Sequence, residues 1–317
     1  MSSRTLFPLG TASQVPTARR NHNGFFLRWD DEGILFDPGE GTQRQLTLAG
    51  IAATDITRIC VTHFHGDHCL GLPGVIQRLS LDRVPHPVRV YFPASGMVFF
   101  DRLRRASIYA GLEHLDVRPI ESPGLVDEDD KLKIVAARLD HEVDCLGYRV
   151  VEPDAFRVLP AALAASGLRG PEVGQLLREG RIEREGRIIL REALTEPRPG
   201  QSFAFVMDTR PCPGALDLAR GADLLVCEST FLESERAVAE RAGHMTARQA
   251  AGLARDAGAR RLVLTHFSQR YEDAQRFLDE ALPIHPETEL AVEPTPDGGA
   301  SPIPGPRRRS ALAGDGL

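Results

Sequence analysis

The chain has 317 residues, of which 42% are hydrophobic and 26% are charged, and 38 basic against 44 acidic residues give a net charge of −6. This balance is typical of a soluble globular protein with a sizeable core, and it excludes fibrous, collagen-like and wholly disordered chains. An acidic chain is not a general electrostatic binder of nucleic acid, so a polyanion would require a local basic patch or bound cations.

The cysteines and the apolar runs indicate the compartment. Five cysteines without any C-x-x-C spacing favour neither a disulfide framework nor a cysteine zinc site. The first residues, MSSRTLFPLG, lack the apolar stretch of a signal peptide, and no apolar run approaches the ~20 residues that span a bilayer. We therefore expect a cytoplasmic protein without a membrane segment.

Short apolar runs and helical patterns are mixed along the whole chain, which predicts an α/β or α+β class. The predicted strands are Gly24–Trp29, Gly33–Phe36, Arg58–Thr62, Val88–Phe92, Leu132–Ala136, Ser202–Met207, Leu224–Cys227 and Leu262–Thr265. The predicted helices are Gly39–Leu48, Val75–Leu79, Ala94–Ala110, Pro213–Arg220, Ala247–Ala257 and Glu272–Leu282.

Two segments differ from the rest. Residues 151–199 are rich in Arg, Glu, Gly and Pro, carry few strand signals and lie between two core-like segments, so we interpret them as an inserted arm. Residues 1–150 and 200–293 would then be the two halves of one domain. Residues 294–317 are rich in Pro and Gly without periodicity, which predicts a disordered tail.

The strongest chemical signal is Thr62-His63-Phe64-His65-Gly66-Asp67-His68, which directly follows an apolar strand. His63 and His65 project to the same side of an extended backbone, because side chains alternate with period two. Gly66 permits a turn that brings Asp67 and His68 to a neighbouring point. Imidazole together with carboxylate favours zinc, with manganese or iron as alternatives, and the cluster suits two ions better than one.

Two metal ions need more ligands than one loop supplies, and three strand ends offer them. His141, Asp208 and His266 each follow a predicted strand, and His266 repeats the strand-Thr-His pattern of His63. Open α/β sheets build their sites at the carboxyl ends of strands. We therefore expect these three side chains to converge on the histidine cluster.

Glu228 and His244 are candidates for a second layer around this site. Glu228 ends a predicted strand, and His244 precedes Thr246-Ala247-Arg248-Gln249, a capping box that makes Thr246 the predicted N-cap of a helix. The helix dipole disfavours a charged His244 and a facing Glu228 favours it, so we expect an imidazole held near neutrality that can donate a proton to a leaving oxygen.

The cluster His63-Phe64-His65-Gly66-Asp67-His68 resembles the H-x-H-x-D-H motif of the metallo-β-lactamase superfamily. Further motifs, in the same order, resemble the short form of the ribonuclease Z family of tRNA 3′-end processing endonucleases. They are Gly39-Glu40-Gly41-Thr42-Gln43, His68-Cys69-Leu70-Gly71-Leu72-Pro73-Gly74, Asp208-Thr209-Arg210-Pro211, Glu228-Ser229-Thr230-Phe231, His244-Met245-Thr246 and Thr265-His266-Phe267-Ser268-Gln269-Arg270-Tyr271.

This resemblance implies an α/β fold, namely a metallo-β-lactamase-like four-layer αββα sandwich with an inserted protruding arm. It implies a zinc-dependent phosphodiesterase that removes the 3′ trailer from precursor tRNA and leaves a 3′-hydroxyl on the tRNA and a 5′-phosphate on the trailer. The implied ligands of two Zn²⁺ per subunit are His63, His65 and His141 for one ion, Asp67, His68 and His266 for the other, and Asp208 as the bridge.

The resemblance also implies roles outside the metal ligands. Asp67 orients the attacking water, while His244, steered by Glu228, protonates the departing 3′ oxygen. Ser268 and Arg270 lie in a segment that resembles the phosphate-contacting loop of the family. Gly170-Pro171-Glu172-Val173-Gly174-Gln175-Leu176 resembles part of the family's tRNA-gripping arm, which makes Arg169 and Arg178 candidate RNA contacts.

Two departures from the family pattern stand in this sequence. Met207 replaces the usual glycine before the bridging aspartate, and Glu172 and Gln175 stand where the family has small and basic residues. The first affects local packing, and the second bears on the strength of RNA contact. Because the arm is remote from the site, we expect a homodimer in which the arm of one subunit holds RNA that the other cuts.

Two other functions compete with this interpretation. A hydrolase of the same superfamily acting on small phosphodiesters, sulfates or lactones would share every metal ligand, although it would have no use for an arginine-bearing arm. A non-catalytic RNA-binding or scaffolding module on a decayed fold is disfavoured by candidates for all seven ligand positions.

Overall fold

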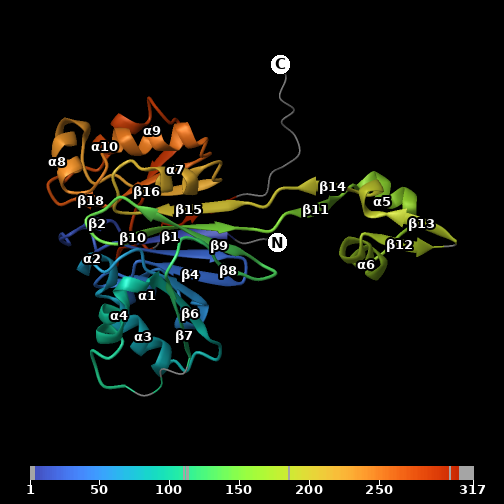
Figure 1. Cartoon of the computed structure of the whole chain (residues 1–317), viewed down its shortest axis with the longest axis horizontal. Helices are drawn as coiled ribbons and strands as arrows, with labels where there is room; N and C mark the ends of the chain where they lie inside the picture. The colour runs from blue at the N-terminus through green and yellow to red at the C-terminus, as the bar shows by residue number, and fades with distance from the viewer. Residues whose placement is uncertain (1–3, 110, 112–113, 185, 300, 307–317) are drawn as a thin grey trace.

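The computed structural model describes residues 4–306 except 110, 112–113, 185 and 300. Two seven-stranded sheets pack face to face, with helices on both outer faces, so the predicted four-layer αββα sandwich is confirmed (Figure 1). A slender arm leaves one end of this body. Within the described residues, no helix is both long and apolar enough to cross a bilayer.

The first sheet is built mainly from the N-terminal half of the chain. Its strands in spatial order are β20 (Ile303–Pro304), β1 (Arg4–Gly10), β3 (Gly24–Trp29), β4 (Glu32–Phe36), β5 (Arg58–Cys60), β6 (Val88–Pro93) and β7 (Leu115–Ile120). The β4, β5, β6 and β7 strands are parallel to one another. Their carboxyl ends therefore lie at one edge of the sheet.

The second sheet is built mainly from the C-terminal half. Its strands in spatial order are β19 (Thr288–Leu290), β17 (Leu262–Thr265), β16 (Leu224–Glu228), β15 (Ser202–Val206), β10 (Cys145–Val151), β9 (Lys133–Leu139) and β8 (Gly124–Glu128). Because β10 is antiparallel to both β9 and β15, while β16 and β17 are parallel to β15, the strands β9, β15, β16 and β17 share one direction.

Helices cover the outer face of each sheet. On the first sheet lie α1 (Thr42–Leu48), α3 (Leu72–Leu81) and α4 (Met97–Leu103), and on the second lie α7 (Pro213–Ala219), α9 (Ala247–Ala257) and α10 (Gln275–Ala281). The remaining helices of the body are α2 (Gly66–Cys69) and α8 (Arg236–Arg241), with 3₁₀ turns η1 (Ala53–Asp55), η2 (Ala94–Gly96) and η4 (Glu233–Glu235). Thr246 caps α9 through a capping box, as the sequence predicts.

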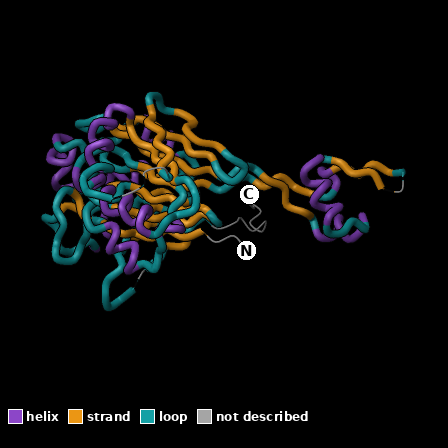
Figure 2. Tube along the Cα trace, turned by 90° about the horizontal axis from the view of Figure 1, so that it is seen from below, coloured by secondary structure: helices purple, strands orange, loops and turns teal. Residues whose placement is uncertain are grey.

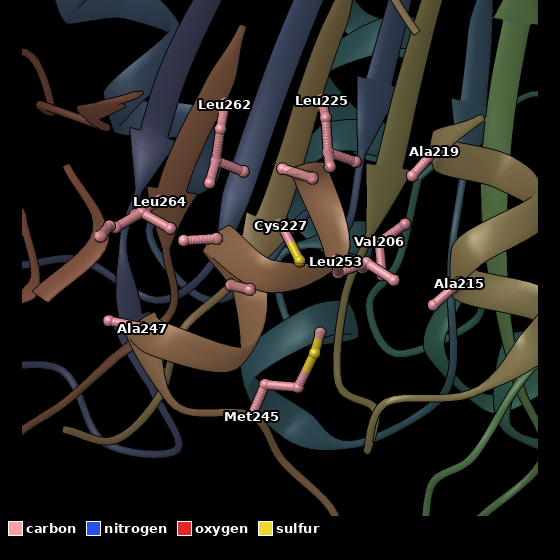
Figure 3. Packing of buried hydrophobic residues seen from close by; sticks show 14 of the residues in the cluster. Val206, Ala215, Ala219, Leu225, Cys227, Met245, Ala247, Leu253, Leu262 and Leu264 are labelled. Atoms are coloured by element: carbon pink, nitrogen blue, oxygen red, sulfur yellow. The ribbon is translucent and has the colours of Figure 1, made fainter. Parts of the chain in front are cut away.

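Alanine-rich helices pack closely on the second sheet. Figure 3 shows Leu253 of α9 and Ala215 of α7 against the β-strand residues Val206, Leu225 and Leu264. Between the two sheets the core is aromatic, and the rings of Phe36 and Phe205 stack with centroids 4.8 Å apart. Burial of this apolar surface holds the layers together and fixes the strand ends that carry the site.

The arm has a secondary structure of its own despite its few strand signals. Its elements are β11 (Ala155–Val158), α5 (Pro160–Ser166), α6 (Pro171–Glu179), β12 (Arg181–Arg184), β13 (Arg187–Leu190), η3 (Arg191–Ala193) and β14 (Thr195–Arg198). The β11 and β14 strands pair with each other and lead away from the body (Figure 2). The buried side chains Leu168, Leu176, Ile182 and Leu194 form an apolar cluster made of arm residues alone.

The disordered tail predicted for residues 294–317 is wrong for its first part. Ile303 is buried and pairs with Leu6 as β20 joins the edge of the first sheet next to β1. This pairing links the two ends of the chain, and local composition does not reveal such a contact. Residues 307–317 lie outside the described residues.

Candidate metal centre and active site

The predicted ligands lie just beyond the carboxyl ends of strands from both sheets, in loops and in the short helix α2. His63, His65, Asp67 and His68 follow β5 of the first sheet, and the others follow β9, β15 and β17 of the second: His141, Asp208 and His266. These strand ends meet at one edge of the sandwich, so seven side chains from distant parts of the chain lie in one place.

The seven side chains form two adjacent groups. Potential ligand atoms of His63, His65, His141 and Asp208 lie within 4.8 Å of one another, as do those of Asp67, His68 and His266. Asp208 also faces the second group, since its Oδ1 is 3.2 Å from His266 Nε2 and its Oδ2 is 3.2 Å from His68 Nε2. A single carboxylate thus lies between two imidazole-rich groups.

Unsatisfied polar atoms mark the space between these groups. His68 Nε2, His266 Nε2 and Asp208 Oδ1 are buried, and although both imidazole nitrogens lie 3.2 Å from an Asp208 oxygen, none of the three atoms makes a hydrogen bond of suitable geometry among the described residues. Leaving such atoms unpaired is costly, and a divalent cation would satisfy all of them. The donor set therefore fits divalent metal ions.

Partners of the second ring nitrogen orient three of the histidines. His68 Nδ1 lies 2.8 Å from Asp37 Oδ2, His141 Nδ1 lies 3.0 Å from the Gly243 carbonyl oxygen, and His266 Nδ1 lies 2.9 Å from Thr230 Oγ1. Each contact leaves Nε2 directed to the centre. Such outer contacts fix the ring orientation and the tautomer of a metal-ligating histidine.

Three residues at the strand ends have a strained backbone conformation, and all three belong to the site or contact it. Asp37, Asp208 and His266 have φ angles of 43°, 49° and 63°, in the left-handed region that non-glycine residues rarely adopt. Each residue directly follows, or lies one residue beyond, a strand of the central sheets. Strain of about 1–3 kcal/mol per residue persists where surrounding structure enforces it, most often at functional sites.

The sequence analysis missed Asp37. This carboxylate is fully buried, accepts hydrogen bonds from Thr62 N (2.7 Å) and Thr62 Oγ1 (2.8 Å), and contacts His68. The signal was present, because Asp37 follows the apolar strand Gly33–Phe36 as Asp208 follows its own strand. The backbone N–H of Gln14, which donates to Asp67 Oδ2 at 2.7 Å, had no comparable signal.

Asp37→Asn is expected to weaken metal binding about 10–100-fold, because the variant loses the charge that orients and polarises His68 while keeping the size of the side chain. Competition with a chromophoric chelator measures this affinity. Asp31→Asn, in the exposed turn between β3 and β4, is the matched control. Equal affinity in the two variants would contradict the orienting role.

Glu228 and His244 lie together beside the ligands. Glu228 is fully buried at the end of β16, and its Oε1 is 3.0 Å from His244 Nδ1. Potential ligand atoms of His244, Asp208 and His266 lie within 4.8 Å of one another. Burial disfavours the charged imidazole, but the Glu228 carboxylate outweighs it and raises the pKa of His244 to about 9, above the near-neutral balance expected from the sequence.

The predicted RNA-contacting residues lie on two separate surfaces, one beside the predicted ligands and one on the arm. Ser268 is nearly buried in β18 (Phe267–Ser268), which pairs with β2 (Ala12–Ser13). Arg270 is half-exposed, pairs with Glu235 and lies over the Phe231 ring. Arg169 and Arg178 are exposed on the arm, which leaves the end of the body away from the predicted ligands. The structure thus brings the predicted metal ligands together and leaves these four residues on two separate surfaces.

Comparison with known proteins defines the family. The chain matches the model of the metallo-beta-lactamase superfamily over residues 17–147 and that of the beta-lactamase superfamily domain over residues 189–267. It is 60% identical to a ribonuclease Z of Salinispora arenicola over 89% of this chain and 91% of the relative. The chain belongs to the ribonuclease Z family.

Other ribonuclease Z relatives and a solved structure agree with this assignment. A ribonuclease Z of Streptomyces coelicolor is 53% identical over 98% of this chain and 100% of its own length. The crystal structure of human tRNase Z, short form, superposes with a TM-score of 0.66 at 27% identity, covering 92% of this chain and 97% of that one. The family resemblance and the metallo-β-lactamase fold inferred from the sequence are confirmed.

Proposed function

We propose that this ribonuclease Z is an endoribonuclease that removes the 3′ trailer from precursor tRNA, leaving a 3′-hydroxyl on the tRNA and a 5′-phosphate on the trailer. The observation that carries this proposal is the position of Asp208 in a chain of this family: its Oδ2 lies 3.6 Å from His63 Nε2 of one group, and its Oδ1 lies 3.2 Å from His266 Nε2 of the other. That arrangement suits a pair of metal ions clamping one phosphodiester.

Two Zn²⁺ ions are the cofactors we propose, with Mn²⁺ or Fe²⁺ as alternatives that the same ligands accept. When bound, such ions lower the pKa of a water and neutralise charge on the scissile phosphate. One would be held by His63, His65 and His141, the other by Asp67, His68 and His266, with Asp208 between them. Asp67, which is buried in the second group, would also orient the attacking water.

His244 is the proposed general acid. Its Nδ1 is held by Glu228, which leaves Nε2 free to donate a proton to the departing 3′ oxygen of the ribose. Glu228 also accepts hydrogen bonds from Thr209 N (2.7 Å) and Met245 N (3.1 Å), so its carboxylate is immobilised. Glu228 therefore steers His244 without touching the substrate.

The presence of the arm favours RNA over a small molecule as the substrate. It carries eight arginines and eight acidic residues, so it is not a uniformly basic surface. Four arginines form ion pairs with acidic residues, namely Arg157, Arg184, Arg191 and Arg198. Among the described residues of the arm, the exposed arginines without an ion pair are Arg169, Arg178, Arg181 and Arg187. These four are the guanidiniums available to RNA phosphates.

The arm and the metal centre lie at opposite ends of the body, which favours a homodimer. The arm joins the body where β10 ends and β15 begins, whereas Asp208 follows the other end of β15. An arm that points away from its own centre serves the centre of a second subunit more easily. We therefore propose that one subunit holds the tRNA that the other cuts.

Mapping the cut in one precursor tRNA tests the function. We expect the zinc-loaded protein to convert a 5′-end-labelled precursor into one shorter product that accepts a poly(A) tail, since its end is a 3′-hydroxyl. The released trailer should be degraded by an exonuclease that requires a 5′-phosphate. Hydrolysis of bis(p-nitrophenyl) phosphate without any cleavage of tRNA would instead support the small-phosphodiester hydrolase.

A further inference from the structure

The joint between the arm and the body is built from polar contacts. The apolar cluster of the arm includes no residue of the body, so hydrophobic packing does not set the direction of the arm. The chain passes from β10 to β11 through residues 152–154 and returns from β14 to β15 through residues 199–201. The contacts of these short segments must therefore fix how the arm is aimed.

Glu152 lies at the centre of the joint. Its carboxylate receives two contacts from Arg198 of the arm strand β14, at 2.9 and 3.3 Å, and two from Arg4 of the body strand β1, at 3.0 and 3.1 Å. It also accepts a hydrogen bond from Gln201 N at 3.2 Å. One carboxylate thus ties the returning arm strand to the edge of the body.

The body side of the joint is rigid. The Arg4 guanidinium lies 4.0 Å from the centre of the Trp29 ring and also donates to Gln201 Oε1 (2.8 Å) and Asp30 Oδ2 (3.0 Å). A planar guanidinium held by three acceptors and an aromatic face has little freedom to turn. Gly200 passes so close to the Glu152 carbonyl oxygen that an added Cβ would lie 1.8 Å from it.

The ion pairs of the joint are shielded from water. The side chains of Arg4, Glu152 and Arg198 are only 2%, 11% and 19% exposed. Desolvation opposes the charged carboxyl, but hydrogen bonds from Arg4 and Arg198 outweigh it and lower the pKa of Glu152 to about 2. Shielded, bidentate pairs hold a geometry better than exposed ones do.

We propose that Glu152 is a positioning residue for tRNA cleavage, which holds the arm at the angle at which bound tRNA reaches a metal centre. This inference rests on the proposed function. Without the carboxylate, the arm samples further directions, and only a fraction of molecules is competent to bind. The apparent affinity for tRNA falls by that fraction, while the chemistry at the distant metal centre is unchanged.

Glu152→Gln in the full zinc-loaded chain tests the proposal. If about one molecule in ten retains the competent direction, KM for precursor tRNA rises about tenfold, while kcat stays within about twofold. Hydrolysis of bis(p-nitrophenyl) phosphate should equal that of the unmodified protein. Arg198→Gln, which leaves the Arg4–Glu152 contact in place, should also raise KM for precursor tRNA. This second variant keeps the test decisive if Glu152→Gln misfolds.

Glu196→Gln is the matched control, because it removes an exposed ion pair with Arg157 on the same two arm strands without touching the body. Its KM and kcat for precursor tRNA should equal those of the unmodified protein. An unchanged KM in both joint variants, or an equal loss on tRNA and on the small diester, would overturn the positioning role. Failure of the unmodified protein to cut tRNA would refute the proposed function itself.

Discussion

Asp208→Ala is expected to abolish hydrolysis of both precursor tRNA and bis(p-nitrophenyl) phosphate. Asp208 faces both groups of predicted ligands, so its loss should prevent the proposed pair of cations from being held together. Metal binding lowers the pKa of a water from 15.7 to about 7, and losing this effect should reduce the rate at neutral pH by at least about a thousandfold.

Elemental analysis and initial rates check this expectation together. The unmodified protein should contain about two divalent ions per chain, and the variant should contain fewer. Asp217→Ala is the matched control, because Asp217 is an exposed aspartate of α7 that pairs only with Arg220 among the described residues. Retention of both ions and of full activity in the Asp208 variant would refute the bridging assignment.

Removal of the arm is expected to reduce cleavage of precursor tRNA strongly and to leave hydrolysis of bis(p-nitrophenyl) phosphate almost unchanged. With residues 155–198 replaced by a short Gly-Ser linker, kcat/KM for precursor tRNA should fall at least about a hundredfold, equivalent to ~2.8 kcal/mol of lost contacts. Hydrolysis of the small diester should stay within about twofold, because the arm has its own apolar cluster and the body core remains whole.

Steady-state kinetics measure the loss of kcat/KM on each of the two substrates. Thermal unfolding of the shortened chain verifies that the body folds. A variant with Arg169 and Arg178 changed to Gln, which keeps the arm in place, tests whether the loss comes from the exposed guanidiniums. Equal loss on tRNA and on the small diester after arm removal would mean that the arm is needed for the fold of the body, contrary to the proposal.

The convergence of the predicted ligands could be expected from the sequence because one simple pattern repeats. A buried parallel strand reads as a short apolar run, and the residue after it lies at the carboxyl edge of the sheet whatever the pairing order. This rule placed His63, Asp208 and His266 without any knowledge of which strands are neighbours. Applied once more, it would have found Asp37.

Other features of the protein depend on contacts between residues that are far apart in the sequence, which a local sequence pattern does not reveal. The ordering of Ile303 requires pairing with β1 at the opposite end of the chain. The pKa of His244 depends on how close Glu228 comes in the folded protein, and Glu228 Oε1 lies 3.0 Å from His244 Nδ1. The direction of the arm depends on Arg4, which is separated from Glu152 by almost half of the chain.

The self-contained apolar cluster of the arm has a consequence for how such enzymes diversify. Because Leu168, Leu176, Ile182 and Leu194 pack only with arm residues, a change in the arm sequence leaves the packing of the catalytic body undisturbed. The segment between Glu152 and Gln201 is therefore a module that could be grafted between homologues. Exchange of this module would alter which RNAs are captured while the hydrolytic machinery stays the same.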